Sequence, residues 1–312
     1  MTMSHPSKAP ASSMVPRAGH RTTRCLARTA GLIAGAAEWH NNADESPIVG
    51  YRAATVGQRA VVDGAAPATT RSPSACACAR PEPANAYHRP MSQPAFPIEA
   101  GPVTLAGPAG ALELCIDRPE DGVAPLPLVA IVCHPLPTEG GTMHNKVVTM
   151  TARALRELGA TTVRFNFRGT GQSEGSFDEG RGEVDDLHAI AAWAREQRPG
   201  TAVWLAGFSF GAYVALRAAA SLKPDLLITI APPVGRWDFA GIELPTMPWL
   251  VVQGENDEVV DPQAVYDWLE KSKSQAELVR MSDTSHFFHR KLIDLRGAIK
   301  NGVKAYLPAA NG

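Results

Sequence analysis

A serine between two glycines is the residue whose type and setting point most directly to covalent chemistry. Residues 207–211 read Gly-Phe-Ser-Phe-Gly, the G-x-S-x-G pattern. Glycine two positions either side of a serine permits a very tight turn, because no side chain collides there. Between a buried strand and a helix, such a turn exposes the hydroxyl beside free helix N–H groups. The pattern therefore predicts Ser209 as a nucleophile; the alternative is a purely structural Gly-Ser turn.

A nucleophilic serine needs two partners elsewhere in the chain. Its hydroxyl is weakly nucleophilic near neutral pH, so it requires a base, and the base requires an orienting acid. In strand–turn–helix settings of this kind, the chain order is serine, then Asp or Glu, then histidine. Asp257 follows an expected strand at 249–253, and His286 follows one at 276–280. We therefore predict Asp257 as the orienting acid and His286 as the base.

Other acids and histidines compete for these two roles. The acids that follow the same strand are Glu255, Glu258 and Asp261. Asp261 precedes a proline and a helical stretch, which is typical of a helix N-cap. His289 is the second candidate base, but we expect it to enter the last helix. His134 and His144 precede the serine, which is the wrong order for a base, so we expect them to shape a loop.

The oxyanion of an acyl-transfer intermediate needs two backbone donors. The first predicted donor is the N–H of Phe210, directly after the serine. The second should come from the loop that follows the strand ending at Cys133. Pro135 and Pro137 in that loop have no N–H. Leu136, which lies between them, is therefore the predicted second donor.

Strands and helices alternate along most of the chain. A Gly/Pro turn between 103–105 and 111–116 predicts a hairpin. Short β-rich runs predict strands at 128–133, 162–167, 202–206, 226–230, 249–253 and 276–280. Helical patterns occupy 147–158, 183–196, 210–221, 262–271 and 290–306. This alternation predicts an α/β fold: a mostly parallel, doubly wound sheet with helices on both faces.

Composition excludes several classes of protein. The 312 residues carry 30 Lys/Arg and 31 Asp/Glu, a net charge of −1, which argues against a basic nucleic-acid surface. No apolar run approaches the roughly 18 residues of a membrane span. The five cysteines lack zinc-like spacing. We therefore expect no cofactor, no metal and neither nucleic acid nor membrane as a partner, and we expect a cytoplasmic protein.

The chain divides into two segments of different composition. Residues 1–90 hold 10 Lys/Arg, 5 Asp/Glu and 9 of the 26 prolines, whereas residues 91–312 hold 20 Lys/Arg and 26 Asp/Glu. The first segment shows no sustained periodicity, so we expect residues 1–95 to form a disordered extension. The change in composition near residue 90 also suggests an alternative, in which translation starts at Met91 and not at Met1. Residues 96–310 are the predicted catalytic domain.

Residues 96–310 resemble the α/β-hydrolases. They are similar to small lidless bacterial serine hydrolases in the neighbourhood of dienelactone hydrolases and Xaa-Pro peptidases. The stretches that carry the resemblance are 133–135, 140–143, 166–169, Gly171, 173–175, 207–211, 254–257 and 286–289. The resemblance implies the α/β-hydrolase fold and the same roles for Ser209, Asp257 and His286. The serine nucleophile differs from the cysteine of true dienelactone hydrolases, which disfavours that activity.

A cap domain would have to fit between two predicted strands. The strands that end at Ile230 and begin at Trp249 are only 249 − 230 = 19 positions apart. We therefore expect no cap and an open pocket. Aromatic residues expected either to line it or to pack in the core are Phe208, Phe210, Trp237, Phe239 and Phe287.

These features predict a serine hydrolase that acts on small to medium carboxylic esters through an acyl-enzyme intermediate. The alternatives are a thioesterase or peptidase of the same fold, and a non-catalytic binding protein with this fold. The sequence leaves the acyl and alcohol specificity, the oligomeric state and the pathway open.

Overall fold

The computed structural model describes residues 93–310. Almost all of the expected extension at 1–95, including the alternative start at Met91, lies outside the described residues. At the beginning of the described chain, the Trp193 indole donates to the carbonyl of Pro94 at 2.7 Å. Phe96 stacks on the same indole, with 4.8 Å between ring centroids.

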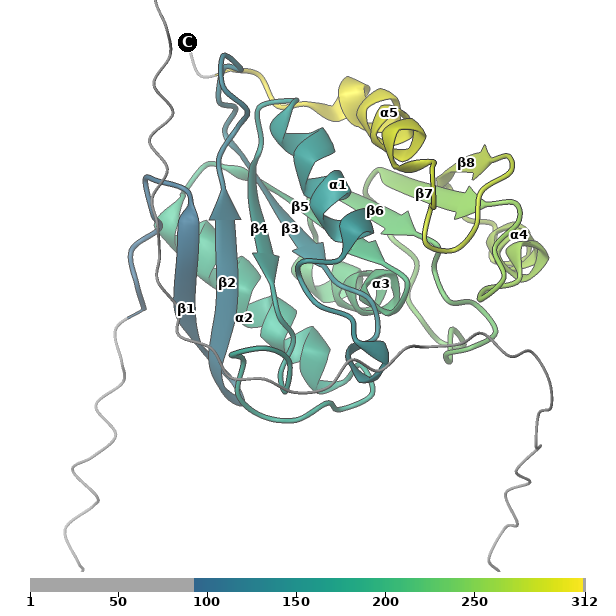
Figure 1. The fold of residues 1–312 in the computed structure, drawn as a ribbon, viewed down its shortest axis with the longest axis horizontal. Helices are drawn as coiled ribbons and strands as arrows, with labels where there is room; N and C mark the ends of the chain where they lie inside the picture. Colours follow the sequence, from purple (N-terminus) through teal and green to yellow (C-terminus); the bar gives the residue numbers. More distant parts are fainter. Residues whose placement is uncertain (1–92, 311–312) are drawn as a thin grey trace, which may run out of the picture. The chain divides into compact units, whose positions relative to one another are not determined.

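Eight strands form one sheet in the order β1-β2-β4-β3-β5-β6-β7-β8 (Figure 1). The strands are β1 (Gly101–Gly107), β2 (Gly110–Asp117), β3 (Leu128–Cys133), β4 (Thr161–Phe165), β5 (Ala202–Phe208), β6 (Leu226–Ile230), β7 (Trp249–Gly254) and β8 (Glu277–Met281). β1 and β2 form the predicted antiparallel hairpin, and β2 is antiparallel to β4. The pairs from β4 to β8 are all parallel, so the predicted mostly parallel sheet is confirmed.

Helices cover both faces of the sheet. The helices are α1 (Lys146–Arg156), α2 (Gly182–Gln197), α3 (Phe210–Leu222), α4 (Pro262–Lys271) and α5 (Leu292–Val303). α1 and α5 pack on one face, and α2 and α3 lie behind the sheet in Figure 1. Successive side chains of β3 pack on opposite faces of the sheet. Ile131 lies in the core under α2, α3 and α4, and Val132 lies in the core under α1 and α5.

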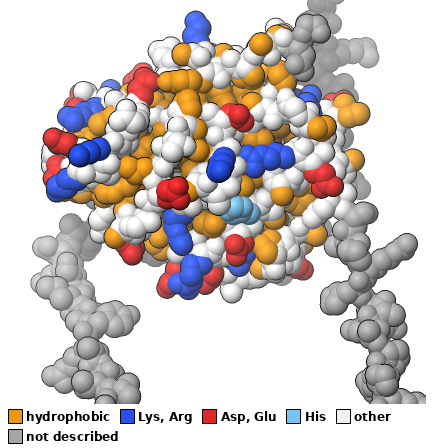
Figure 2. Space-filling model, turned by 180° about the vertical axis from the view of Figure 1, so that it is seen from behind, with side chains coloured by type: hydrophobic (Ala, Val, Ile, Leu, Met, Phe, Trp, Pro, Cys, Tyr) orange, Lys and Arg blue, Asp and Glu red, His pale blue; other side chains and the backbone are white. Residues whose placement is uncertain are grey.

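Charged side chains are mixed on the face that carries α2 and α3. Figure 2 shows acidic and basic side chains interspersed with apolar ones on that face. Among the described residues, no helix is both long enough and apolar enough to cross a membrane.

The last helix differs from its predicted range. It begins at Leu292, not at 290, and a short 3₁₀ turn follows it at Lys304–Tyr306. Phe288 and Arg290 have φ values of 54° and 62°, which a right-handed helix cannot include. His289 therefore lies in an irregular turn and does not enter the helix, contrary to the sequence-based expectation.

The segment between β6 and β7 contains no cap domain. Residues 231–248 form turns and bends with no helix. The carboxyl edge of the parallel strands is therefore left open at this point, as the short spacing predicted. Ligands of open α/β sheets bind at this edge.

Candidate active site

Ser209 sits at the sharp junction between β5 and α3. Its φ of 52° and ψ of −119° are unusual for a residue with a side chain. Its backbone N–H donates to the carbonyl of Ile230 at 2.8 Å, which ties the turn to β6. A Cβ at Gly207 would lie 2.2 Å from the Gly211 carbonyl oxygen, and one at Gly211 would lie 2.5 Å from the Cys133 carbonyl oxygen. Only glycine fits these two positions, so the G-x-S-x-G pattern reflects the geometry of the turn.

The structure brings the three predicted side chains together from three separate loops. His286 Nε2 lies 3.1 Å from Ser209 Oγ, and His286 Nδ1 lies 2.8 Å from Asp257 Oδ2. The histidine and the aspartate are both buried. An imidazole between a hydroxyl and a carboxylate can accept the hydroxyl proton and be held in one orientation by the carboxylate.

Aromatic rings fix the plane of the His286 imidazole. Phe208 packs against it with 5.1 Å between centroids, and Phe287 packs edge-on at the same centroid distance. Phe208 also contacts the fully buried Phe288. Phe288 takes a positive φ, a conformation that costs free energy for a bulky residue. Phe288 therefore anchors the loop that carries His286 in the core.

The Asp257 carboxylate accepts four hydrogen bonds. Oδ1 accepts from the backbone N–H groups of Val259 at 2.9 Å and Val260 at 2.7 Å. Oδ2 accepts from Gln253 Nε2 at 3.0 Å as well as from His286. Burial alone would raise the pKa of Asp257, but the hydrogen bonds from His286, Val260 and Val259 outweigh it and hold that pKa below its usual value. Asp257 is therefore ionised at neutral pH.

The competing acids have other contacts. Glu258 Oε2 accepts from the backbone N–H of His286 at 3.0 Å, so it holds the loop and not the imidazole. Glu255 accepts from the Ser282 hydroxyl at 2.9 Å. Asp261 caps α4 by accepting from the Gln263 N–H at 3.0 Å, which confirms the predicted N-cap.

His134 fixes the peptide that precedes Leu136. Its Nε2 accepts from the Phe167 N–H at 3.0 Å, so Nδ1 carries the proton and donates to the Pro135 carbonyl at 2.7 Å. Burial lowers the pKa of His134 to about 4, which keeps the ring neutral. In a trans peptide the N–H points away from the C=O. The Leu136 N–H therefore points away from His134, and the expected loop-shaping role of this histidine is confirmed.

The two predicted oxyanion donors border one cavity with Ser209. Leu136, Phe210 and Ser209 all line a cavity of about 210 Å³, hereafter the catalytic cavity. Gly141 closes the turn after Leu136 by donating its N–H to the Leu136 carbonyl at 3.0 Å. A Cβ on Gly141 would lie 2.2 Å from the Pro135 carbonyl oxygen, so only glycine permits this close approach.

Side chains at the end of β4 support the same loop, and sequence reasoning missed them. Asn166 Oδ1 accepts from the Met143 N–H at 2.9 Å, and Arg164 Nη1 donates to the Met143 carbonyl at 3.0 Å. Arg164 is itself held by Asp117, with Nε 2.6 Å from Oδ2. Buried polar residues at a strand end are the signal that could have revealed this support.

The aromatic lining of the catalytic cavity agrees with prediction only in part. Phe210, Trp237 and Phe287 line it. Phe208 does not, because it points to the opposite face of the sheet and packs under α1 and α5. Phe239 is buried against Tyr213 and Trp268. Among residues 93–310, no group of three or more His, Cys, Asp or Glu side chains is placed to hold a metal ion.

Comparisons with known proteins agree with this fold. A family model described as serine aminopeptidase S33 matches residues 132–246, a range that includes Ser209 and ends before Asp257. A crystal structure of a lidless α/β serine hydrolase from Xanthomonas campestris is 65% identical, with a TM-score of 0.68, and the match covers 70% of this chain and 100% of that one.

Two further relatives are more distant. The structure of an α/β serine hydrolase homologue from Coxiella burnetii is 45% identical, with a TM-score of 0.64, over 67% of this chain and 100% of that one. An uncharacterized protein of Rickettsia prowazekii is 32% identical over 206 residues, which is 62% of this chain and 85% of the relative. The chain therefore belongs to the α/β serine hydrolases that lack a lid.

Proposed function

We propose that this serine hydrolase cleaves small to medium carboxylic esters, with Ser209 as nucleophile, His286 as base and Asp257 as orienting acid. The observation that carries the proposal is the continuous contact from Ser209 Oγ to His286 Nε2 at 3.1 Å and from His286 Nδ1 to Asp257 Oδ2 at 2.8 Å. The three residues also follow one another in the order typical of this fold.

The first half-reaction transfers the acyl group to the enzyme. His286 Nε2 takes the proton of Ser209 as Oγ attacks the ester carbonyl carbon and the carbonyl π electrons move to oxygen. The N–H groups of Phe210 and Leu136 stabilise this oxyanion. When the carbon–oxygen bond to the alcohol breaks, His286 gives its proton to the leaving oxygen. Asp257 stays ionised and stabilises the transient imidazolium.

The second half-reaction returns the enzyme to its starting state. Water attacks the acyl-enzyme carbonyl and gives a proton to His286, and the oxyanion forms between the same two N–H groups. When the bond to Ser209 Oγ breaks, the proton passes from His286 to the serine. The carboxylic acid leaves through the open cavity, since residues 231–248 form no cap over it.

The decisive experiment uses p-nitrophenyl esters of increasing chain length. We expect turnover by the wild type and a loss of at least about 10³-fold in Ser209→Ala. Ser221→Ala is the matched control, because Ser221 is an exposed serine on α3, the helix that follows Ser209. A fluorophosphonate probe should label the wild type and the control but not Ser209→Ala. Undiminished turnover by Ser209→Ala contradicts the proposal, and failure of the wild type to react with the probe favours a non-catalytic binding protein.

A peptidase activity is the second candidate, because the matching family model is described as a serine aminopeptidase. Aminoacyl p-nitroanilides distinguish a peptidase from an esterase, because they present an amide bond in place of the ester. The anilides and the p-nitrophenyl esters both release a chromophore, so their cleavage rates can be compared directly. An esterase leaves the anilides intact at enzyme concentrations that consume the esters within minutes. A thioesterase would favour the matched acyl thioesters.

We also propose that residues 96–310 form the catalytic domain and that residues 1–95 are an extension to it. Intact-mass analysis of the natively expressed protein tests the alternative start at Met91, which a full-length species would contradict.

We further propose a cytoplasmic location. The described cysteines, Cys115 and Cys133, are free thiols, which a reducing compartment maintains.

A further inference from the structure

A second cavity opens beside the catalytic cavity, and its lining is basic. It has a volume of about 560 Å³ and is hereafter the basic cavity. Its lining includes Lys146, Arg290, His144 and His289, and no Asp or Glu. The basic cavity and the catalytic cavity share three lining residues, Gly140, Asn145 and Phe287. A molecule bound at Ser209 can therefore extend past Phe287 without leaving the surface of the site.

The positive charge of the basic cavity is not neutralised by nearby carboxylates. Within the described part of the chain, Lys146 and Arg290 form no ion pair, whereas the next residue, Lys291, lies 3.8 Å from Asp294. Residues 91–312 carry 20 Lys/Arg and 26 Asp/Glu, a net charge of −6. The exposed Lys146 and Arg290 therefore give the basic cavity a charge opposite to that of the domain as a whole. Such a cavity attracts anions.

The backbone adds to the case for Arg290. Its φ of 62° lies in the left-handed region, where glycine is least strained. Arg290 is also only four positions after His286, in the same anchored loop. A substrate group held by Arg290 would therefore be bound by the same loop that carries the imidazole.

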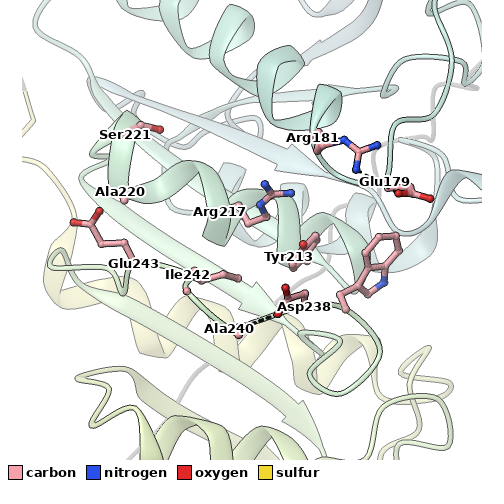
Figure 3. Close-up of a pocket in the computed structure, with 12 residues that line it drawn as sticks. Glu179, Arg181, Tyr213, Arg217, Ala220, Ser221, Asp238, Ala240, Ile242 and Glu243 are labelled. Carbon is pink, nitrogen blue, oxygen red and sulfur yellow. Dashed lines mark hydrogen bonds and ion pairs between the residues drawn. The ribbon is translucent and has the colours of Figure 1, made fainter. Parts of the chain in front are cut away.

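Another cavity lacks this single-sign character. It measures about 690 Å³ and lies between α3 and the segment 237–243 (Figure 3). Its lining includes two arginines and three acids, Glu179, Asp238 and Glu243. Arg181 already pairs with Asp178 at 2.9 Å, and Arg217 lies over the ring of Tyr213 at 5.4 Å. Mixed and partly satisfied charges indicate no class of ligand, so this cavity carries no assignment.

We propose that the basic cavity is an anion subsite of the active site, which binds a compact carboxylate or phosphate group carried by the substrate. The inference rests on the proposed ester hydrolysis and narrows its substrate class to esters with an anionic group on the acyl or the alcohol side. Lys146 and Arg290 supply charge-assisted hydrogen bonds to that group. Glu139 lines the catalytic cavity and not the basic cavity.

Matched ester pairs test the subsite in the full chain. On the acyl side, mono-p-nitrophenyl glutarate is compared with p-nitrophenyl valerate, which has the same chain length and no charge. On the alcohol side, 4-acetoxybenzoate is compared with its methyl ester. We expect a higher kcat/KM for the anionic member of at least one pair. In the double variant Lys146→Gln, Arg290→Gln, kcat/KM for that ester should fall about tenfold, while the neutral partner stays within about twofold.

The control removes the same charge at a distance. Lys271→Gln, Lys273→Gln takes two exposed lysines from the end of α4 and its following turn, so it lowers the net charge equally. We expect it to leave the ratio between anionic and neutral esters unchanged. An equal fall for the anionic ester in this control assigns the preference to overall charge and overturns the subsite.

A binding measurement separates failure of the subsite from failure of the proposed function. Calorimetry on Ser209→Ala with glutarate and with inorganic phosphate requires no turnover. We expect at least one of these anions to bind, with a Kd about tenfold weaker once Lys146 and Arg290 are also replaced. If the wild type cleaves no ester, the proposed function fails and this measurement alone decides the subsite. Absence of binding by both anions, or wild-type kcat/KM values that never favour an anionic ester over its neutral partner, overturns the proposal.

Discussion

The side-chain amide of Gln253 donates to the same carboxylate oxygen of Asp257 that contacts His286. Gln253 Nε2 lies 3.0 Å from Asp257 Oδ2 and 3.2 Å from the Gly254 carbonyl oxygen. Gln253 Oε1 is buried and has no hydrogen-bond partner within the described residues. An unsatisfied buried acceptor costs about 1–3 kcal/mol. The glutamine therefore keeps its donor on Asp257 at a cost in stability, which indicates that it positions the carboxylate.

Replacing Gln253 by methionine tests this positioning. The side chain keeps its approximate shape, the unsatisfied oxygen disappears, and Asp257 loses one donor. We expect the free energy of unfolding to change by less than about 1.5 kcal/mol, because the two effects oppose each other. We expect kcat for ester hydrolysis to fall about tenfold, because the carboxylate is held less firmly.

A pH profile separates this role from a purely structural one. Asp257 without this donor has a less stabilised ionised form, so its pKa rises in the variant. The same loss leaves more negative charge on the Asp257 oxygen that contacts His286, which favours the imidazolium over the neutral base, so the acidic limb of kcat/KM should move to higher pH than in the wild type. Exposed Gln263 on α4 gives the control, Gln263→Met, which should leave the limb in place. If Gln253→Met keeps both kcat and the acidic limb, the positioning role is wrong.

Glu258 and His286 offer a second test, at the backbone. Glu258 Oε2 accepts the N–H of His286 at 3.0 Å. Removal of this acceptor in Glu258→Ala should loosen the loop and lower kcat about three- to tenfold. Glu258→Gln retains a carbonyl oxygen that can accept the same N–H, and should keep most of the activity. Steady-state kinetics on one ester check both variants. Equal losses in alanine and glutamine would mean that charge, not the contact, matters.

Much of this architecture follows from local patterns in the chain. Short β-rich runs gave the parallel strands because such strands are buried on both faces. The tight turn at Ser209 was visible because only glycine fits at 207 and 211. The gap between Ile230 and Trp249 was too short for a cap domain, and the structure has none.

Side-chain directions and contacts between distant parts of the chain were harder to predict from the sequence. Phe208 and Phe210 are two positions apart, yet only Phe210 faces the catalytic cavity, because the chain turns sharply between them. Gln253 reads as an ordinary strand residue, since nothing local shows that its amide meets Asp257. The last helix was predicted two residues too early because a positive φ at Arg290 has no signature in a non-glycine residue.

The buried His134 makes stability depend on pH. Burial lowers its pKa from 6.5 to about 4 in the folded protein. Between these values the unfolded chain binds a proton that the folded protein does not, so the free energy of unfolding falls as pH falls. The contribution is about 3 kcal/mol, fully present above pH 6.5 and lost by about pH 4.

Urea unfolding between pH 7.5 and pH 4.5 measures this loss. His134→Gln removes the titrating ring and leaves an amide that can both donate and accept. We expect the variant to be less stable at pH 7.5 and to show a shallower dependence on pH than the wild type. His144→Gln is the control, because His144 is exposed and should change the slope little. Parallel curves for His134→Gln and the wild type would contradict the assignment.

Gly211 and Gly297 form a matched pair because both lie in helices and differ in the space around them. A Cβ at Gly211 in α3 would lie 2.5 Å from the carbonyl oxygens of Cys133 and His134, whereas one at Gly297 in α5 meets nothing within 4 Å. Gly297→Ala should stabilise the protein by about 0.5–1 kcal/mol through helix propensity. Gly211→Ala should destabilise it by about 2–4 kcal/mol, since backbone must move. Thermal unfolding checks both. The carbonyl groups that must shift belong to the segment that leads to Leu136, so we also expect ester hydrolysis to fall in any folded Gly211→Ala protein. Full activity of that protein would show that the loop tolerates the shift of these carbonyl groups.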